Sequence, residues 1–240
     1  MRMKKRILIL ILILLASAGT LLAVTYTQPF AAGHGFAPTQ SGACDSTYTD
    51  NAADSTDGNP VNSVNSLCIG RNDVPTTTWK KSLTWIDMGV TPGNTVTLVD
   101  GKFDHQRTRQ THAQVAQVGP LTIMDSGEVA SCMAADPEAV FSYPNSTGLI
   151  SWATRDATGG VAPIAACQPA ATTVVVRFGI TPRTGNNASA QTQVNVDNLI
   201  LVITETTPSA RSRAIMISMK SDGTMERKFG PWKTTKGESQ

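Results

Sequence analysis

The sequence lacks the repeating pattern that amphipathic helices produce. After residue 25 no long stretch places apolar side chains with a period of 3.6 residues, although 40% of the 240 residues are hydrophobic. Apolar residues instead recur at every second position in short segments bounded by Gly, Pro and Asn, which is typical of strands joined by turns. The missing helical period therefore favours an all-β chain over a helical domain.

The sequence also lacks the short motifs that mark common enzymes. It contains no G-x-S-x-G elbow, no H-E-x-x-H zinc motif and no glycine-rich phosphate loop. The segment DHQRTRQTH would supply general acid–base or metal-binding groups if a loop between strands brought Asp104, His105 and His112 together. We expect no catalytic activity, and an exported hydrolase remains the lower alternative because folding can pair carboxylates from any acidic residues.

Charged residues are scarce, at 16%, and their signs are unevenly distributed. The four basic residues before residue 7 give +4, and from Arg211 onward seven basic and three acidic residues give another +4. Between these ends, nine basic and 15 acidic residues give −6. An acidic middle excludes nucleic acid as the partner of that region.

Aromatic residues are few: the chain has four Trp, three Tyr and six Phe. A sandwich core consumes several of them, which leaves little for an exposed sugar-binding platform. The candidates for a ligand-binding role, each with core packing as its alternative, are Trp79, Trp85, Phe141, Tyr143 and Trp152.

The N-terminus has the composition of a secretory signal peptide. A basic start is followed by an apolar run from Ile7 to Leu15 and by the small residues Ala16-Ser17-Ala18. Apolar character resumes at Leu21 to Val24, and a helix from Ile7 to Val24 would nearly span a bilayer. We therefore expect residues 1–24 to form an apolar helix that is either a signal peptide or a membrane anchor. The membrane is a partner only in the second case.

Four cysteines in an exported chain predict two disulfides, because oxidising compartments preserve such bonds. Three connectivities are possible. The nearer partners meet most easily, which favours Cys44–Cys68 and Cys132–Cys167. C-x-x-C pairs are absent, so a zinc site is not indicated.

The strand pattern divides the chain. Residues 25–77 are rich in small and polar side chains and predict an irregular segment held by the first disulfide. Residues 78–207 carry the alternating segments and predict an antiparallel β-sandwich or jelly roll. Residues 208–240 predict a basic hairpin, with Ile215, Ile217 and Met219 alternating, and a polar tail.

Within the sandwich, the segments SLTWIDMGVTPGNTVTLVDGKF, VGPLTIMDSG, TTVVVRFGI and VNVDNLILVIT occur in this order. Together they resemble bacterial extracellular jelly-roll modules, including carbohydrate-binding modules of the family 4 type, over Trp79 to Thr204. The resemblance implies a glycan as the partner. It also implies that Asp197, in the V-D-N stretch of the last strand, helps to bind a structural calcium or fixes an adjacent loop.

Asp197 and Asn198 are unexpected inside an apolar strand, because strands disfavour both residue types. A regular strand would place Val194, Val196, Ile200 and Val202 on one face and Asp197 on the other. Asp197 is then a solvated residue at an edge or bulge, a hydrogen-bonding brace, or a calcium ligand, and calcium needs several oxygens. A second acidic group that would suit calcium is Asp45, Asp50, Asp54 and Asp57.

These observations predict an extracellular, periplasmic or cell-surface module that binds glycan or acts as a structural component. An assembly subunit resembling a pilin is the alternative, because an apolar N-terminus precedes a cysteine-bridged β-rich body. Pro29, Gly33 and Gly35 would interrupt a long assembly helix. No cofactor is indicated apart from the possible calcium.

Overall fold

A computed structural model describes residues 21–31, 33–42, 44, 48–50, 63–157, 159–208, 212–219 and 225–233. Within these residues no helix is long and apolar enough to cross a membrane. The expected N-terminal helix lies outside the described residues, apart from its last four positions. The elements are β1 Leu21–Gln28, β2 Ala37–Ser41, β3 Tyr48–Asp50, β4 Val64–Ile69, β5 Thr76–Thr84, β6 Thr95–Gln110, β7 Gln117–Asp125, β8 Phe141–Ser142, β9 Ile150–Arg155, the 3-10 helix η1 Ala165–Cys167, β10 Thr173–Thr181, β11 Gln191–Thr206, β12 Ser212–Met219 and β13 Met225–Lys233.

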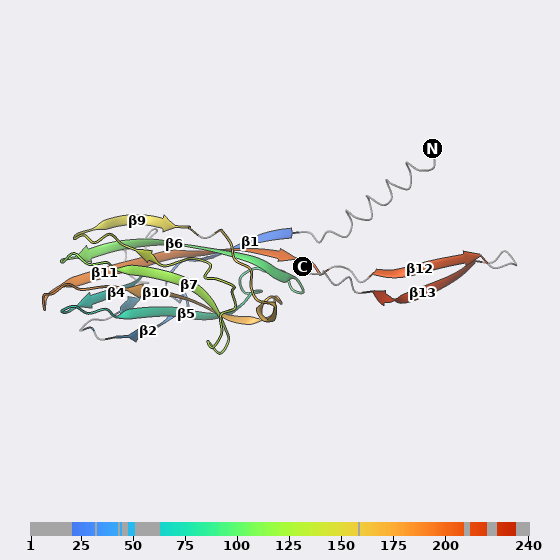
Figure 1. Ribbon diagram of the computed structural model, residues 1–240, viewed down its shortest axis with the longest axis horizontal. Helices are drawn as coiled ribbons and strands as arrows, with labels where there is room; N and C mark the ends of the chain where they lie inside the picture. The colour runs from blue at the N-terminus through green and yellow to red at the C-terminus, as the bar shows by residue number, and fades with distance from the viewer. Residues whose placement is uncertain are drawn as a thin grey trace, which may run out of the picture. The chain divides into compact units, whose positions relative to one another are not determined.

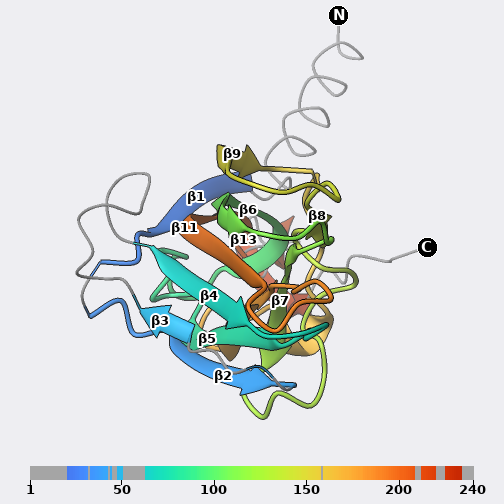
Figure 2. The same cartoon turned by 90° about the vertical axis from the view of Figure 1, so that its left-hand side faces the viewer.

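Residues 21–206 form a two-layered antiparallel β-sandwich (Figure 1). The first sheet has the order β3-β4-β11-β6-β9, with β1 also paired to β11, and the second has the order β2-β5-β10-β7-β8. Figure 2 shows β9, β1 and β11 in one layer and β5 and β2 in the other. The eight strands from β4 to β11 follow the jelly-roll order, β4-β11-β6-β9 in one sheet and β5-β10-β7-β8 in the other, which confirms the antiparallel β-sandwich expected from the sequence.

Apolar side chains from both sheets meet between the layers. The fully enclosed residues include Trp79 from β5, Phe178 from β10 and Leu201 from β11. Alternate residues of a strand point to opposite faces, so the partly exposed polar side chains of the same strands lie on the outer faces. The outer faces are therefore where a ligand could reach the sheets.

The segment expected to be irregular, residues 25–77, contributes strands to both sheets. β1 pairs with β11 from Leu21↔Thr206 to Gln28↔Leu199, and β2 pairs with β5. Polar and small residues alternate along β2, so hydrophobic periodicity could not reveal a strand at a sheet edge. The same pairing shows that an apolar helix does not extend over Leu21 to Val24, because these residues belong to strand β1.

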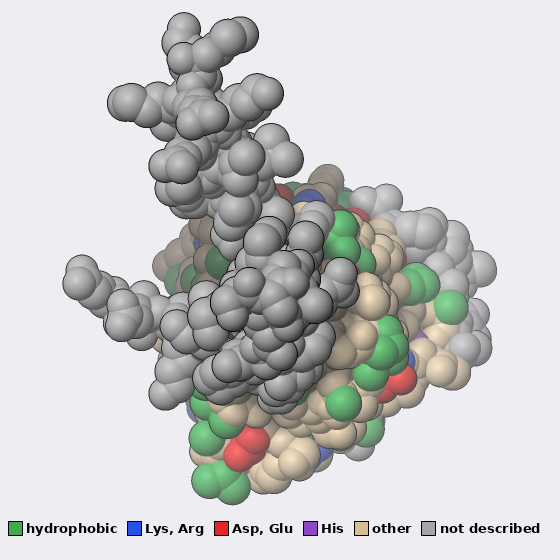
Figure 3. Space-filling view, turned by 90° about the vertical axis from the view of Figure 1, so that its right-hand side faces the viewer, with side chains coloured by type: hydrophobic (Ala, Val, Ile, Leu, Met, Phe, Trp, Pro, Cys, Tyr) green, Lys and Arg blue, Asp and Glu red, His purple; other side chains and the backbone are tan. Residues whose placement is uncertain are grey.

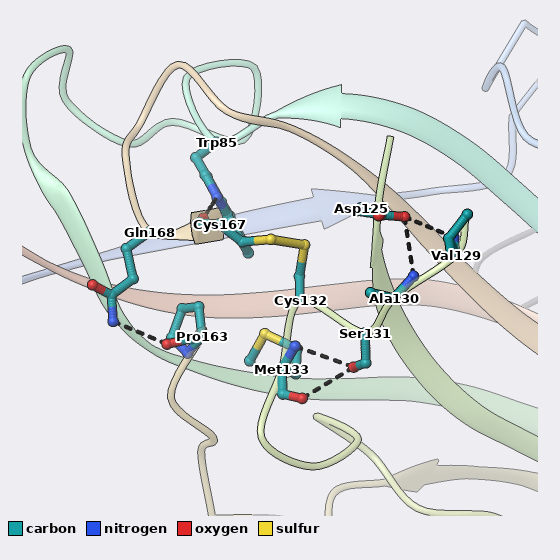
Figure 4. The surroundings of a disulfide bond; sticks show 10 residues. All are labelled: Trp85, Asp125, Val129, Ala130, Ser131, Cys132, Met133, Pro163, Cys167 and Gln168. Atoms are coloured by element: carbon teal, nitrogen blue, oxygen red, sulfur yellow. Dashed lines mark hydrogen bonds between the residues drawn. A yellow bond between two sulfur atoms is a disulfide. The ribbon is translucent and has the colours of Figure 1, made fainter. Parts of the chain in front are cut away.

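Both disulfides have the connectivity favoured by the sequence. Cys44–Cys68 ties the chain after β2 to β4, and Cys132–Cys167 ties the chain after β7 to η1. The second bond is enclosed in the core beside Trp85 (Figure 4). Each bond crosses between segments that are distant in sequence and so limits the conformations of the unfolded chain.

The expected late hairpin is present as β12 and β13, a separate unit from the sandwich. The two strands pair antiparallel from Ser212↔Lys233 to Met219↔Met225. The register shifts between Arg213 and Ile215, close to Pro231 on the facing strand, where a residue without an N–H is tolerated.

Candidate functional site

The Asp197–Asn198 pair is a β-bulge at a change of partner strand. β11 has β6 along one edge, whereas its other edge pairs with β4 up to Val196 and with β1 from Leu199. The β6 register shifts between Asp197 and Ile200, and Asn198 has φ of 47°. Asn is one of the few residues that adopt this left-handed conformation readily, which explains its place in an apolar strand.

The bulge reverses which residues of β11 face the core. Val194 and Val196 are fully enclosed before it, and Leu199, Leu201 and Ile203 are fully enclosed after it. The expectation that Ile200 and Val202 share a face with the two earlier valines is therefore wrong. One inserted residue moves every later side chain to the opposite face.

Asp197 is not solvated, since its side chain is 1% exposed. Its Oδ1 accepts a 2.8 Å hydrogen bond from the backbone N–H of Asn198. The Asn198 Nδ2 donates to Asp104 Oδ2 at 3.0 Å, and Thr154 Oγ1 donates to Asp104 Oδ1 at 2.6 Å. The contacts of Asp104 with Asn198 and Thr154 tie β11, β6 and β9 together. The burial of Asp197 and its hydrogen bond to the Asn198 N–H favour the hydrogen-bonding role over the solvated one.

The same contacts define a polar surface on the outer face of the first sheet. Trp152 lies in the edge strand β9. The register between β6 and β9 shifts there, so that Ser151 and Trp152 both lie opposite Gln106. Trp152 is half-buried but is not one of the hydrophobic residues packed on the core, so it lies on the outer side with Thr154. We call this surface the β9 platform; its residues are Asp104, Gln106, Trp152, Thr154 and Asn198.

The other aromatic candidates are structural. Trp79 and Trp85 are 0% exposed and Tyr143 is 1% exposed, so the expectation that they bind a ligand is wrong. The indole N–H of Trp85 donates to the backbone oxygen of Cys167 at 2.6 Å (Figure 4). Phe141 is half-buried and packs on the core and on the Tyr143 ring. The few aromatics are used mainly to fill the sandwich.

The histidines and the aspartate of segment 104–112 are separated by the fold. The segment continues strand β6 to Gln110 and does not form the expected loop. Asp104 faces outward, whereas His105 is 3% exposed and faces inward. His112 lies beyond the end of the strand, and seven residues of extended chain from His105 to His112 span about 20 Å. The expected acid–base or metal-binding group does not form.

His105 belongs instead to a buried polar group under the chain that leads from β8 to β9. Its Nδ1 and the Tyr143 hydroxyl share a 2.8 Å hydrogen bond. The pKa of His105 is lowered to about 4, mainly by burial and also by the charge of Arg155, while Asp104 opposes the shift. The adjacent Arg107 is fully enclosed and donates to the Pro144 carbonyl at 3.0 Å. The imidazole is therefore neutral at neutral pH.

Glu138 supplies a buried negative charge close by. Its side chain is 0% exposed, and its Oε1 lies 3.0 Å from Arg155 Nε. The other oxygen accepts the backbone N–H of Ala157 at 2.8 Å. Arg155 also stacks on the Phe141 ring, with 5.6 Å between the guanidinium carbon and the ring centroid. The ion pair fastens the chain before β8 to β9.

The calcium candidates are only partly described. Asp45, Asp54 and Asp57 lie outside the described residues, and only the backbone of Asp50 is described, in β3. The one cluster of metal-type side chains in the described part of the chain is Cys44, Cys68 and Asp73. Its two sulfurs form a disulfide and are not thiolates, so it is not a metal centre.

The described surface shows no broad apolar face in the view of Figure 3. Hydrophobic side chains form small groups there, and charged side chains are interspersed with polar ones. Among the described residues, the most exposed large hydrophobic side chains are Val129, Leu21 and Leu149, at 85%, 68% and 62%. The described apolar side chains in this view therefore do not form one large continuous patch.

Comparisons with known proteins give no family. No protein-family model matches the chain, and no curated protein matches it. Similar solved structures include the carbohydrate-binding module TmCBM61 in complex with β-1,4-galactotriose, at 11% identity and a TM-score of 0.32, with 72% of this chain and 90% of that chain covered. The C-terminal family 22 carbohydrate-binding module of Clostridium thermocellum Xyn10B is 12% identical, with a TM-score of 0.32 and coverages of 77% and 95%.

A third similar structure is the enzymatically active domain of bacteriophage CBA120 tailspike protein 4. It is 11% identical, with a TM-score of 0.36 and 70% of this chain covered. The chain spans about a fifth of that structure's length, since the match covers 19% of it. At these TM-scores the similarities support no functional conclusion, and the function has to be argued from the side chains.

Proposed function

We propose that the chain is an exported, non-catalytic jelly-roll module that binds an extracellular polysaccharide through the β9 platform. The observation that carries the proposal is the position of Trp152. Among the three tryptophans of the sandwich it alone is outside the core, and it lies opposite Gln106 of β6 and two residues from Thr154 in β9.

The chemistry of this surface suits a sugar. A pyranose ring has an apolar C–H face that packs on an indole and a rim of hydroxyls that donate and accept hydrogen bonds. Gln106 supplies an amide, Thr154 a hydroxyl and Asp104 a carboxylate next to the indole. Hydrogen bonds hold Asp104 in place before a ligand arrives, and such preorganisation lowers the entropic cost of binding.

Export is supported by the N-terminal pattern and by the two disulfides, which persist in oxidising compartments. Because Leu21 to Val24 belong to β1, the apolar run available for a helix is Ile7 to Thr20. A membrane-spanning helix needs about 20 residues. A cleaved signal peptide ending near Ala18 leaves β1 intact, so we favour a signal peptide over an anchor.

No specific observation favours either alternative function, the pilin-like subunit or the hydrolase. A pilin-like subunit needs an apolar N-terminal helix that continues into the body, whereas residues 21–28 are paired with β11 as a strand. A hydrolase needs a group of acid–base residues at an accessible site, and Asp104 and His105 lie on opposite faces of β6. We therefore propose a binding role without catalysis.

The experiment is a glycan array with the exported chain and its Trp152→Ala variant. Binding by the wild type that falls at least tenfold in Trp152→Ala, at an unchanged unfolding temperature, supports the platform. Val129→Ala is the matched control, because Val129 is exposed and belongs to the second sheet's turn. Wild-type binding that Trp152→Ala leaves unchanged, or no binding across the array, contradicts the proposal.

A structural calcium near Asp197 remains part of the proposal, because a buried carboxylate beside a bulge is a suitable oxygen ligand. A bound ion stabilises the folded state in proportion to its affinity. If the chain binds calcium, its unfolding temperature should fall when a chelator is added and recover with excess Ca²⁺. An unfolding temperature that the chelator leaves unchanged would contradict a structural calcium.

A further inference from the structure

Two basic side chains lie directly opposite each other on the outer face of the second sheet. Lys80 of β5 and Arg177 of β10 are register partners. Their neighbours Trp79 and Phe178 are enclosed in the core, so Lys80 and Arg177 alternate to the outside. Like charges directly opposite in a sheet are destabilising, so this pair calls for a compensating anion.

The anion in the structure is a carboxylate of the chain itself. Glu128 reaches over the strands, with Oε1 at 2.6 Å from Lys80 Nζ and Oε2 at 3.9 Å from Arg177 Nη1. All three side chains remain 31 to 33% exposed. Arg177 Nε donates to Thr122 Oγ1 at 2.9 Å, which fixes the guanidinium against the sheet. One carboxylate therefore bridges two cations at an accessible place.

Glu128 is held in an unusual backbone conformation. Its φ is 56°, in the left-handed region that residues other than Gly and Asn seldom adopt. Asp125 Oδ1 accepts the N–H groups of Val129 and Ala130 at 2.8 and 3.3 Å, and the enclosed Cys132–Cys167 bond follows (Figure 4). The base of this turn is thus fixed while its tip is exposed. A strained residue held by its surroundings is a reason to consider a functional role.

The outer face beside the two cations continues with small residues. One row further along, Thr78 of β5 is the register partner of Gly179 of β10, which has no side chain. Both residues are half-buried on the outer face. The Gly119 carbonyl oxygen lies 3.1 Å from the position that a Cβ at Gly179 would take. The groups left for a ligand are therefore a hydroxyl and two cations in adjacent rows, which suit a sugar ring that carries a carboxylate.

We propose that Lys80 and Arg177 form a second binding site, for the carboxylate of an acidic sugar in a polysaccharide, and that Glu128 occupies this site as an internal substitute for the ligand. A guanidinium binds a carboxylate through parallel N–H donors, and an ammonium adds a point charge. A uronic acid brings the same group as Glu128, so the ligand exchanges one carboxylate for another and leaves the cations compensated.

A second carboxylate of the chain also faces Arg177. Burial raises the pKa of Asp136, and Arg177 opposes that rise. Both residues are half-buried, but Glu128 lies on a turn whose neighbours Gly127 and Val129 are exposed, so Glu128 is the group that we expect to leave. This site is on the opposite sheet from the β9 platform and does not depend on Trp152.

The tethered carboxylate competes with the ligand. A protein whose competent state is only partly populated binds with an apparent affinity reduced by that fraction. Replacing Glu128 by Gln removes the competing charge at nearly constant size and is expected to tighten binding by about tenfold. In the Glu128→Gln background, Lys80→Gln or Arg177→Gln should abolish the gain.

The test uses the full chain with polygalacturonate as the acidic probe and an uncharged polysaccharide as its control, at low and high salt. The expected order of affinity for polygalacturonate is Glu128→Gln above wild type above the double variants, with a decrease at high salt. Asp156→Asn is the matched control, because it removes one partly exposed negative charge on the first sheet, where Asp156 pairs with Lys102. It should leave the affinity unchanged.

The outcomes are distinct. If Glu128→Gln binds polygalacturonate no better than wild type, or if the double variants bind as well as Glu128→Gln, the internal-substitute proposal is wrong. Absence of polygalacturonate binding by both proteins also overturns it. Unfolding temperatures within a few degrees of wild type establish that each variant is folded. The effect of Trp152→Ala on binding of an uncharged glycan tests the β9 platform and not the site at Lys80 and Arg177.

Discussion

The indole N–H of Trp85 and the backbone oxygen of Cys167 are joined by a hydrogen bond of 2.6 Å. This bond places the largest side chain at the start of the β5–β6 connection against the enclosed disulfide Cys132–Cys167 (Figure 4). The indole therefore reports on the state of that disulfide.

Replacing Cys132 and Cys167 together by Ala should lower the free energy of unfolding by about 3 to 4 kcal/mol, because the bond restricts a loop of this size in the unfolded chain. Trp85 should at the same time emit at longer wavelength, since its packing partner is lost. The matched variant, Ala at Cys44 and Cys68, should leave this emission unchanged. Equal stability of wild type and the Cys132/Cys167 variant in urea would contradict the prediction.

Reduction should distinguish the two disulfides. Cys132 and Cys167 are 0% and 4% exposed, whereas Cys44 is half-buried and more accessible. A thiol reductant under native conditions should therefore open Cys44–Cys68 first. Mass spectrometry after alkylation with a cysteine reagent measures the order. Simultaneous loss of both bonds would show instead that global unfolding limits the reaction.

Asn198 should be replaceable by Gly at lower cost than by Ala. Asn198→Ala loses the hydrogen bond to Asp104 and strains a residue at φ of 47°, for an expected cost of about 2 kcal/mol. Asn198→Gly loses the hydrogen bond but accepts the conformation, for about 1 kcal/mol. Urea unfolding measures both, and the reverse order would contradict the bulge as the cause.

Stability should fall as the pH is lowered from 6.5 towards 4, in part because of His105. Burial lowers the pKa of this residue to about 4 in the folded chain from 6.5. Between these values the unfolded chain binds the proton more readily, so protonation favours unfolding and the contribution is fully present only above pH 6.5. The loss attributable to His105 is on the order of 2 kcal/mol.

The measurement is the free energy of unfolding against pH for wild type and His105→Gln. Carboxylates contribute to both curves, so the difference between their slopes isolates the histidine. Parallel curves between pH 6.5 and 4 would mean that His105 does not titrate in that window. Retention of wild-type circular dichroism by the variant at pH 7 is the control.

Arg155 should be needed chiefly to compensate Glu138. Arg155→Met leaves a fully enclosed carboxylate without its cation and should cost about 3 kcal/mol. Adding Glu138→Gln in the double variant removes the uncompensated charge and should recover part of the loss. A double variant as unstable as the sum of its single variants would show that the two side chains act independently.

The jelly roll was predictable because its strands from β5 onward alternate between apolar and polar residues. The pairing of the cysteines was predictable from their spacing, because cysteines that are near in the sequence meet most easily. β1 and β2 were missed because they lie at sheet edges, where few side chains are enclosed and the alternation is weak. A hydrophobic pattern records burial, and an edge strand buries little.

The binding surfaces depend on register, which single-strand patterns do not contain. Trp152 could be proposed from its residue type. The sequence alone does not show that Trp152 faces outward from an edge strand whereas Trp79 and Trp85 are enclosed in the core. Lys80 and Arg177 are 97 positions apart in the sequence and meet only because β5 and β10 pair. The Asp-Asn dipeptide inside an apolar run was the one visible signal for the bulge.

The pairing of β1 with the second half of β11 has a consequence for how the sandwich folds. Residues 21–28 and their partners, residues 199–206, are separated by most of the length of the sandwich sequence. Contacts of such long sequence separation form slowly. Closure of the sandwich therefore depends on a long-range contact, and β1 remains without its partner until β11 is in place.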